Sequence, residues 1–142
     1  MTNGNDSPRE LNLCRQIPLR QQRSSTLCLD IPWPPTANHI WRTARGISYL
    51  SRQYKDFLAL TYMVVRQQLP RYHKKITSPV RVTIDLYPPT KRIYDIDNRV
   101  KPLLDALTRA GVWADDSLVV ELHVTKRSVL KRGRAIIEIQ EV

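Results

Sequence analysis

The alternation of apolar and polar residues is the clearest pattern in this chain. Because successive side chains of a β-strand point to opposite faces, a period of two predicts a strand with one buried face. Four segments are predicted to be strands on this basis: residues 27–31, 80–86, 119–124 and 135–139. Pro32-Trp33-Pro34-Pro35 ends the first strand and Pro88-Pro89 the second, because proline donates no backbone hydrogen bond. Residues 36–46 are expected to form an irregular loop, followed by a short extended piece at 47–50.

Two other segments carry a helical period instead. Ser51 is a suitable N-cap for a helix that runs to about Leu69, where Pro70 ends it. Its predicted core face consists of Tyr54, Leu58, Tyr62 and Val65, flanked by Phe57 and Leu69. The second helix covers residues 97–110, with apolar residues at Val100, Leu103, Leu104 and Leu107. Gly111 follows as a natural C-cap glycine.

This order of elements predicts an α/β (α+β) fold: a compact two-layer sandwich in which two main helices cover a small mixed β-sheet. The chain shows no internal repeat. Residues 1–25 are polar and aperiodic, so we expect them to form a flexible N-terminal arm. Residues 26–142 are then one domain, which is long enough to bury a core.

The net charge is strongly positive, with 23 Lys and Arg against 13 Asp and Glu. The arm contributes four arginines against two acids, a net +2, so +8 of the formal +10 belongs to the predicted domain. Such a charge fits nucleic acid better than a membrane surface, since no basic amphipathic helix with an aromatic face is present. No apolar run is long enough to span a bilayer and no signal sequence is evident. With Cys14 and Cys28 read as reduced thiols, we expect a cytoplasmic protein.

Against this basic background, five of the 13 acids lie between Asp95 and Asp116. If residues 94–97 are extended, Asp95 and Asp97 project from the same face and can share a divalent ion. Asp97 is also placed to cap the following helix, and Lys101 stands one turn above it. A further carboxylate from Asp115-Asp116 closes the site if the next strand returns beside the start of the helix.

Two interpretations of these acids stay open at this point. Each feature alone has an ordinary explanation: a helix cap for the Asp pair, a surface ion pair for Lys101, a turn for Asp115-Asp116. Their combination, however, places like charges where repulsion costs stability. Carboxylates, a lysine and a basic surface are the minimum set for metal-assisted hydrolysis of a phosphodiester.

The segment Y-D-I-D-N-R-V-K-P-L-L-D-A-L-T-R-A-G-V-W-A-D-D, residues 94–116, strongly resembles the signature of the RusA family of Holliday junction resolvases. The earlier I-P-W-P-P-T-A-N, residues 31–38, resembles that family's strand-ending motif, and the likeness extends over roughly residues 27–142. The resemblance implies a compact α/β fold and a homodimer, often encoded by a phage or prophage. It also implies an endonuclease, dependent on Mg²⁺ or Mn²⁺, that cuts two opposed strands of a four-way DNA junction symmetrically.

Carried over to this sequence, the resemblance makes Asp95, Asp97 and Asp116 the metal-binding catalytic carboxylates and Lys101 the essential lysine. Asp105 and Asp115 are supporting residues and Asn98 supports the start of the helix. Leu104 departs from the family, because an aromatic residue that helps to open the junction can occur at its position. The candidate DNA contacts are Asn38, Arg42, Arg45, Lys74, Lys75, Lys91, Arg92, Lys126, Arg127, Lys131 and Arg132.

The predicted function is therefore that of a crossover junction endodeoxyribonuclease in DNA recombination and repair, acting in the cytoplasm of a bacterium or a phage-infected cell. Two alternatives remain: a non-catalytic DNA-binding protein on the same scaffold, and an endonuclease for other branched DNA such as flaps or forks.

Overall fold

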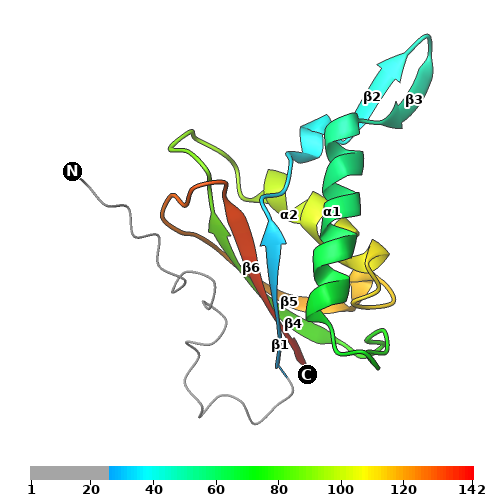
Figure 1. Ribbon diagram of the computed structural model, residues 1–142, viewed down its shortest axis with the longest axis vertical. Coiled ribbons are helices and arrows are strands. Elements are labelled where there is room, and N and C mark those ends of the chain that lie inside the picture. The colour runs from blue at the N-terminus through cyan, green and yellow to red at the C-terminus, as the bar shows by residue number, and fades with distance from the viewer. Residues whose placement is uncertain (1–25) are drawn as a thin grey trace.

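A four-stranded mixed sheet organises residues 26–142, which are the residues that the computed structural model describes (Figure 1). The strands of the sheet are β1 (Thr26–Pro32), β4 (Val80–Tyr87), β5 (Val119–Lys126) and β6 (Arg134–Glu141). The helices are α1 (Arg52–Gln68) and α2 (Asp97–Arg109), and there are short 3₁₀ turns at Ala37–His39 and Asp116–Leu118. A separate hairpin consists of β2 (Trp41–Ala44) and β3 (Ile47–Leu50). The predicted α+β class and mixed sheet are confirmed.

The order of strands in the sheet is β1-β6-β4-β5. β6 pairs antiparallel with both β1 and β4, whereas β4 and β5 are parallel. A parallel pair needs a crossover, and α2 provides it on its way from β4 to β5. The crossover brings the loop before α2 and the loop after β5 to the same end of the sheet, because the carboxyl ends of parallel strands coincide.

The core lies between one face of the sheet and the two helices, which cover the same side of it (Figure 1). The alternation in β4 places Val80, Val82, Ile84 and Leu86 in this core, all completely buried. Their neighbours in the strand face the other side of the sheet. The sequence pattern predicted this strand correctly because it records a single buried face.

Two predictions about the first helix and the segment before it are wrong. The buried residues of α1 are Tyr54, Phe57, Thr61 and Val65. Tyr62 is 51% exposed, because the buried stripe passes through Thr61 and leaves the amphipathic tyrosine at the helix flank. Residues 41–44, expected within an irregular loop, form β2 and pair with β3 from Trp41↔Leu50 to Ala44↔Ile47. The hairpin projects from the N-terminal end of α1 (Figure 1).

Residues 1–25, the predicted flexible arm, lie outside the described residues, so that division of the chain stays a prediction. Cys14 lies there too. The expectation that both cysteines are reduced thiols therefore depends on a residue outside the described ones and stays a prediction. None of the helices within residues 26–142 has the length and hydropathy that a membrane crossing requires.

Candidate active site

Asp95 and Asp97 stand where the loop after β4 enters α2. The helix begins at Asp97, and its N-cap residue is Ile96, which offers no side-chain acceptor. The expected capping role of Asp97 is therefore wrong, although its charge still lies in the first turn, where it meets the positive end of the helix dipole. The Asn98 side-chain amide donates to Asp95 Oδ2 at 3.4 Å, in agreement with its predicted supporting role. Both carboxylates are exposed to solvent.

The turn after α2 determines where Asp116 lies. Gly111 has a φ of +82°, and its N–H donates to Thr108 O while the N–H of Val112 donates to Leu107 O. These two bonds form the Schellman arrangement expected of a C-cap glycine. Trp113 is then completely buried, which anchors the chain before the acidic pair.

Asp115 and Asp116 have different tasks in the following 3₁₀ turn. The Asp115 carboxylate caps the turn by accepting from Ser117 N at 3.2 Å. The hydroxyl of Ser117, and then its backbone N–H, lower the pKa of Asp115. Asp116, the first residue of the turn, instead pairs with Lys101 of α2. This division matches the prediction that Asp115 is a supporting residue.

Lys101 pairs with two acids of the segment. Its Nζ lies 3.0 Å from Asp105 Oδ1 and 3.6 Å from Asp116 Oδ2. The pKa of Lys101 is raised, first by the hydrogen bond to Asp105 and further by the charges of Asp105 and Asp116. Asp97 stands one helical turn before Lys101 on the same side of α2. Lys101 is therefore the residue of α2 that Asp116, from the turn after the helix, approaches.

Within residues 26–142, however, no three His, Cys, Asp or Glu residues lie close enough together to hold a metal ion. The site of three carboxylates therefore stays a prediction. The chemistry of the donors nevertheless fits a small divalent cation, because Asp95, Asp97 and Asp116 all offer carboxylate oxygen. Mg²⁺ commonly takes one or two protein carboxylates and completes its octahedron with waters and substrate phosphate.

Known proteins resemble this chain over most of its length. The family model of endodeoxyribonuclease RusA matches residues 32–140. The chain belongs to the RusA family. It is 32% identical over 118 residues to crossover junction endodeoxyribonuclease RusA of Shigella sonnei strain Ss046 and of Escherichia coli strain K12. The identity is also 32% with the protein of that name from Enterobacteria phage 82. Each alignment covers 83% of this chain and 97% of the relative.

Membership of the RusA family implies the use of a divalent metal ion in general terms. Leu104 was predicted to depart from the family, because an aromatic residue that helps to open the junction can occur at its position. Leu104 is partly buried and packs against the core, and its carbonyl accepts from the Thr108 hydroxyl. Its side chain is thus committed to packing.

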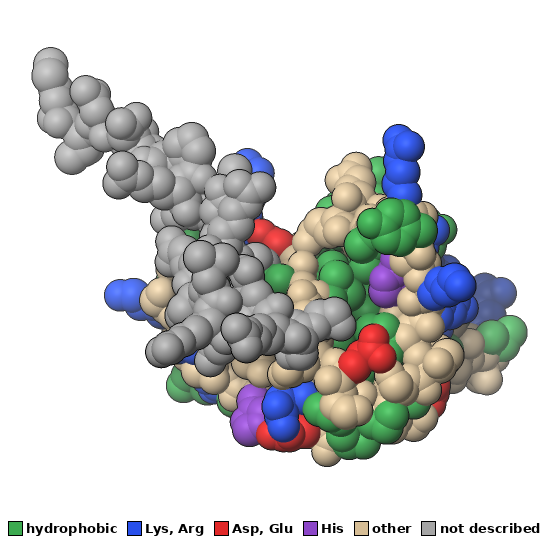
Figure 2. Space-filling view, turned by 90° about the horizontal axis from the view of Figure 1, so that it is seen from below, with side chains coloured by type: hydrophobic (Ala, Val, Ile, Leu, Met, Phe, Trp, Pro, Cys, Tyr) green, Lys and Arg blue, Asp and Glu red, His purple; other side chains and the backbone are tan. Residues whose placement is uncertain are grey.

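The predicted DNA-binding residues of this RusA-family chain fall into separate places. Arg42 and Arg45 are exposed on the hairpin, Asn38 lies in the 3₁₀ turn before it, and Lys74 and Lys75 lie in the loop after α1. Lys131 and Arg132 are exposed in the turn before β6. The structure brings four others together around one pocket: Lys91, Arg92, Lys126 and Arg127. In the space-filling view, basic side chains stand out around the margin of the face that is seen from below (Figure 2).

Sequence reasoning missed an aromatic and cationic cluster beside Asp95. The Arg99 guanidinium lies 5.0 Å from the Trp33 ring centroid and donates from Nη1 to Pro34 O at 2.5 Å. The ring of Tyr94 meets Trp33 edge-on, with 5.3 Å between centroids, and Lys126 Nζ lies 4.4 Å from the Tyr94 ring centroid. Burial lowers the pKa of Arg99 and raises that of Tyr94. The cluster fixes the residues on both sides of Asp95. Two features of the sequence could have indicated this cluster: Trp33 among the prolines of residues 32–35, and Arg99 within the acidic motif.

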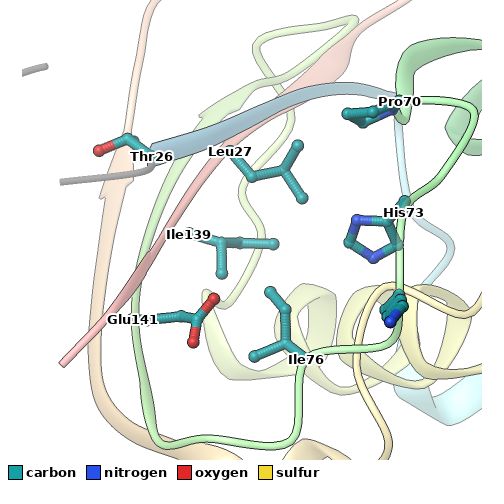
Figure 3. A pocket seen from close by; sticks show the side chains of 8 residues that line it. Thr26, Leu27, Pro70, His73, Ile76, Ile139 and Glu141 are labelled. Atoms are coloured by element: carbon teal, nitrogen blue, oxygen red, sulfur yellow. The ribbon is translucent and has the colours of Figure 1, made fainter.

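Another cavity lies at the N-terminal end of β1. Its volume is about 280 Å³, and Leu27, Ile76 and Ile139 form an apolar lining (Figure 3). His73 stands at its wall and is held by a 3.0 Å hydrogen bond between Nε2 and Val112 O. None of the acids from the 95–116 segment lines this cavity. The cavity is thus separate from the candidate active site.

Proposed function

We propose that this chain is a structure-selective endodeoxyribonuclease that resolves four-way DNA junctions by paired, metal-dependent hydrolysis of phosphodiester bonds. The observation that carries the proposal is the pairing of Lys101 with Asp116 across the turn after α2. It joins the two halves of the acidic motif within a chain whose formal net charge is +10. Family membership supports the same reaction, since the named relatives are crossover junction endodeoxyribonucleases. The cytoplasm of a bacterium or a phage-infected cell is the proposed place of action.

Asp95, Asp97 and Asp116 are the proposed ligands of Mg²⁺ or Mn²⁺. A divalent ion held there supplies charge neutralisation at the phosphate and promotes the ionisation of water. Lys101 has a separate task. Its side chain is 61% exposed, and its ammonium carries a positive charge that can bind a phosphate oxygen and stabilise the charge that develops on it. Asp105 and Asp116 hold that ammonium in place.

A homodimer follows from the symmetry of the substrate. A four-way junction has an approximate two-fold axis, so a C₂ dimer presents two equivalent sites to two equivalent strands. Affinity then comes chiefly from the phosphate contacts of Lys and Arg, and it falls steeply as salt is raised.

The central test compares cleavage and binding of a synthetic four-way junction. Asp95→Asn or Asp116→Asn is expected to slow cleavage by at least about 100-fold while junction affinity is kept or increased, because a negative charge near phosphate is removed. Asp56→Asn, on the exposed side of α1 outside the acidic motif, is the matched control and should cut normally. Full cleavage by the Asp95→Asn protein contradicts the proposal.

A second measurement addresses the substrate. Flap, fork and linear duplex DNA compete against the labelled four-way junction in the presence of Mg²⁺. Preference for the four-way junction supports resolvase activity, whereas equal or better cutting of flaps assigns another branched substrate. Binding without any cleavage under all metal conditions identifies a non-catalytic DNA-binding protein.

A further inference from the structure

Ile93 is the most exposed large apolar residue among those described, with 99% of its surface accessible. A single exposed apolar side chain is ordinary on a protein surface and by itself has no meaning. Its position, however, is special: it stands two residues before Asp95, in the loop that leads from β4 into the candidate active site. Its neighbour Tyr94 turns inward against Trp33, so the polypeptide is held at this point while Ile93 points into solvent.

The surroundings of Ile93 suit a phosphodiester strand. The residue lines a pocket of about 230 Å³ together with Lys91, Arg92, Lys126 and Arg127. Lys126 and Arg127 are oriented by the protein, through a bond to Tyr94 O at 2.5 Å and an ion pair with Asp85 at 2.8 Å.

Lys91 and Arg92 differ from these two. Within residues 26–142, neither of them has a carboxylate within ion-pair distance. Their positive charges are therefore available to bind a polyanion, and the phosphates of a DNA backbone are such a ligand.

Backbone hydrogen bonds hold the walls of this pocket in place. The segment after β5 is tied to the end of β4 by Arg127 N, which donates to Leu86 O at 2.7 Å, and by Leu130 N, which donates to Pro88 O at 2.9 Å. Both segments leave the same end of the sheet, because β4 and β5 are parallel (Figure 1). The pocket therefore keeps a defined position relative to the start of α2.

We propose that Ile93 inserts between base steps of the DNA beside the phosphodiester that is cut, while the cations of the pocket hold the strand that passes it. This inference rests on the proposed function and adds to it a residue that opens the substrate. Phosphate contacts alone need no apolar residue, whereas apolar side chains that enter a base step unstack it and bend the duplex. Ile is well suited to this task because its β-branch leaves few rotamers to be lost on insertion.

The experiment uses the full chain and a four-way junction that carries 2-aminopurine, a base whose fluorescence rises on unstacking, next to the crossover. With divalent metal removed, the unchanged protein is expected to raise the fluorescence on binding. Ile93→Ala is expected to lose most of this rise and, with Mg²⁺ added, to cut at saturating protein roughly tenfold more slowly. Ile93→Leu should retain both signals.

Two controls separate opening from binding and from folding. Junction affinity should change little in Ile93→Ala, because the phosphate contacts remain. Val120→Ala removes a side chain that is 62% exposed on β5 and should behave as the unchanged protein does. A junction with mismatched bases at the crossover, already unstacked, should restore cutting by Ile93→Ala.

The failures of the two proposals are distinguishable. Equal fluorescence and equal cutting by the unchanged protein and Ile93→Ala overturn the insertion and leave the nuclease intact. Absence of cutting by the unchanged protein overturns the proposed function and the insertion together.

Discussion

Replacing Gly133 by alanine tests how the loop before the candidate active site is supported. Gly133 lies in the turn before β6 with a φ of +64°, which L-residues adopt only with strain. A Cβ added there would stand 2.8 Å from Pro89 Cδ, 3.0 Å from Pro89 N and 3.0 Å from Trp33 Cβ. These atoms belong to a proline ring, a backbone and the base of a packed side chain, so none of them can rotate away.

The magnitude has two parts. A left-handed conformation costs a residue other than glycine about 1–2 kcal/mol, which the smaller entropy of the unfolded chain offsets by about 0.4–1 kcal/mol. Contacts near 3 Å, well below the optimal ~3.5–4.0 Å, add an overpacking cost of about 1–3 kcal/mol. The total for Gly133→Ala is therefore about 2–4 kcal/mol. Gly46, at the tip of the hairpin, has a φ of +75° and nothing within 4 Å of the added Cβ, so Gly46→Ala should cost no more than about 1 kcal/mol.

Urea unfolding of the two variants, followed by tryptophan fluorescence and circular dichroism, measures this difference. The backbone cost is common to both, so the excess in Gly133→Ala reports the steric contact with Pro89 and Trp33. A cleavage assay on folded Gly133→Ala should also show reduced activity, because Trp33 packs against Tyr94 beside Asp95. Equal free energies of unfolding for the two variants would refute the reasoning.

Three further predictions concern single side chains. Lys101→Gln should change the free energy of unfolding by less than about 1 kcal/mol, since its ion pairs are exposed, yet slow junction cleavage by about 100-fold or more; normal cutting removes Lys101 from the mechanism. Ser51→Ala should cost about 1 kcal/mol in urea unfolding, because its buried hydroxyl accepts from Tyr54 N at 3.2 Å, and Ser51→Asn should recover part of that loss. Burial, and then the charge of Asp85, raises the pKa of Glu138 above its ordinary value of 4.5. Its charged form therefore opposes folding, so Glu138→Gln should stabilise the protein at pH 7 and lose this advantage as the pH falls through the raised pKa towards 4.5; an advantage that persists below pH 4.5 contradicts this.

Several features of the fold were predictable because their causes are local. The alternation in residues 80–86 records one buried face, and β4 follows it almost residue for residue. The glycine after the second helix has the positive φ that a C-cap requires. The concentration of acids at 95–116 and the motif around it pointed to the family, since the spacing of chemical groups is preserved in the sequence itself.

Other features depended on partners that are distant along the chain. Residues 41–44 show no strong alternation, since all four side chains of β2 are exposed, and they form a strand only because β3 pairs with them. The position of Tyr62 on α1 depended on where the sheet lies relative to the helix, which a helical period alone does not specify.

In the candidate active site, too, some features were fixed by the sequence and others by the tertiary structure. The sequence by itself determined which side chains are available: the acids, Lys101 and the surplus of cations. Tertiary structure decided that Lys101 meets Asp116, that Lys91 and Arg92 share a pocket with Lys126 and Arg127, and that Ile93 is left in solvent. The pocket forms because the parallel pairing of β4 and β5 brings the loops that follow both strands to one end of the sheet. Lys101 meets Asp116 because the chain reverses direction at the turn after α2. No local pattern encodes either of these contacts.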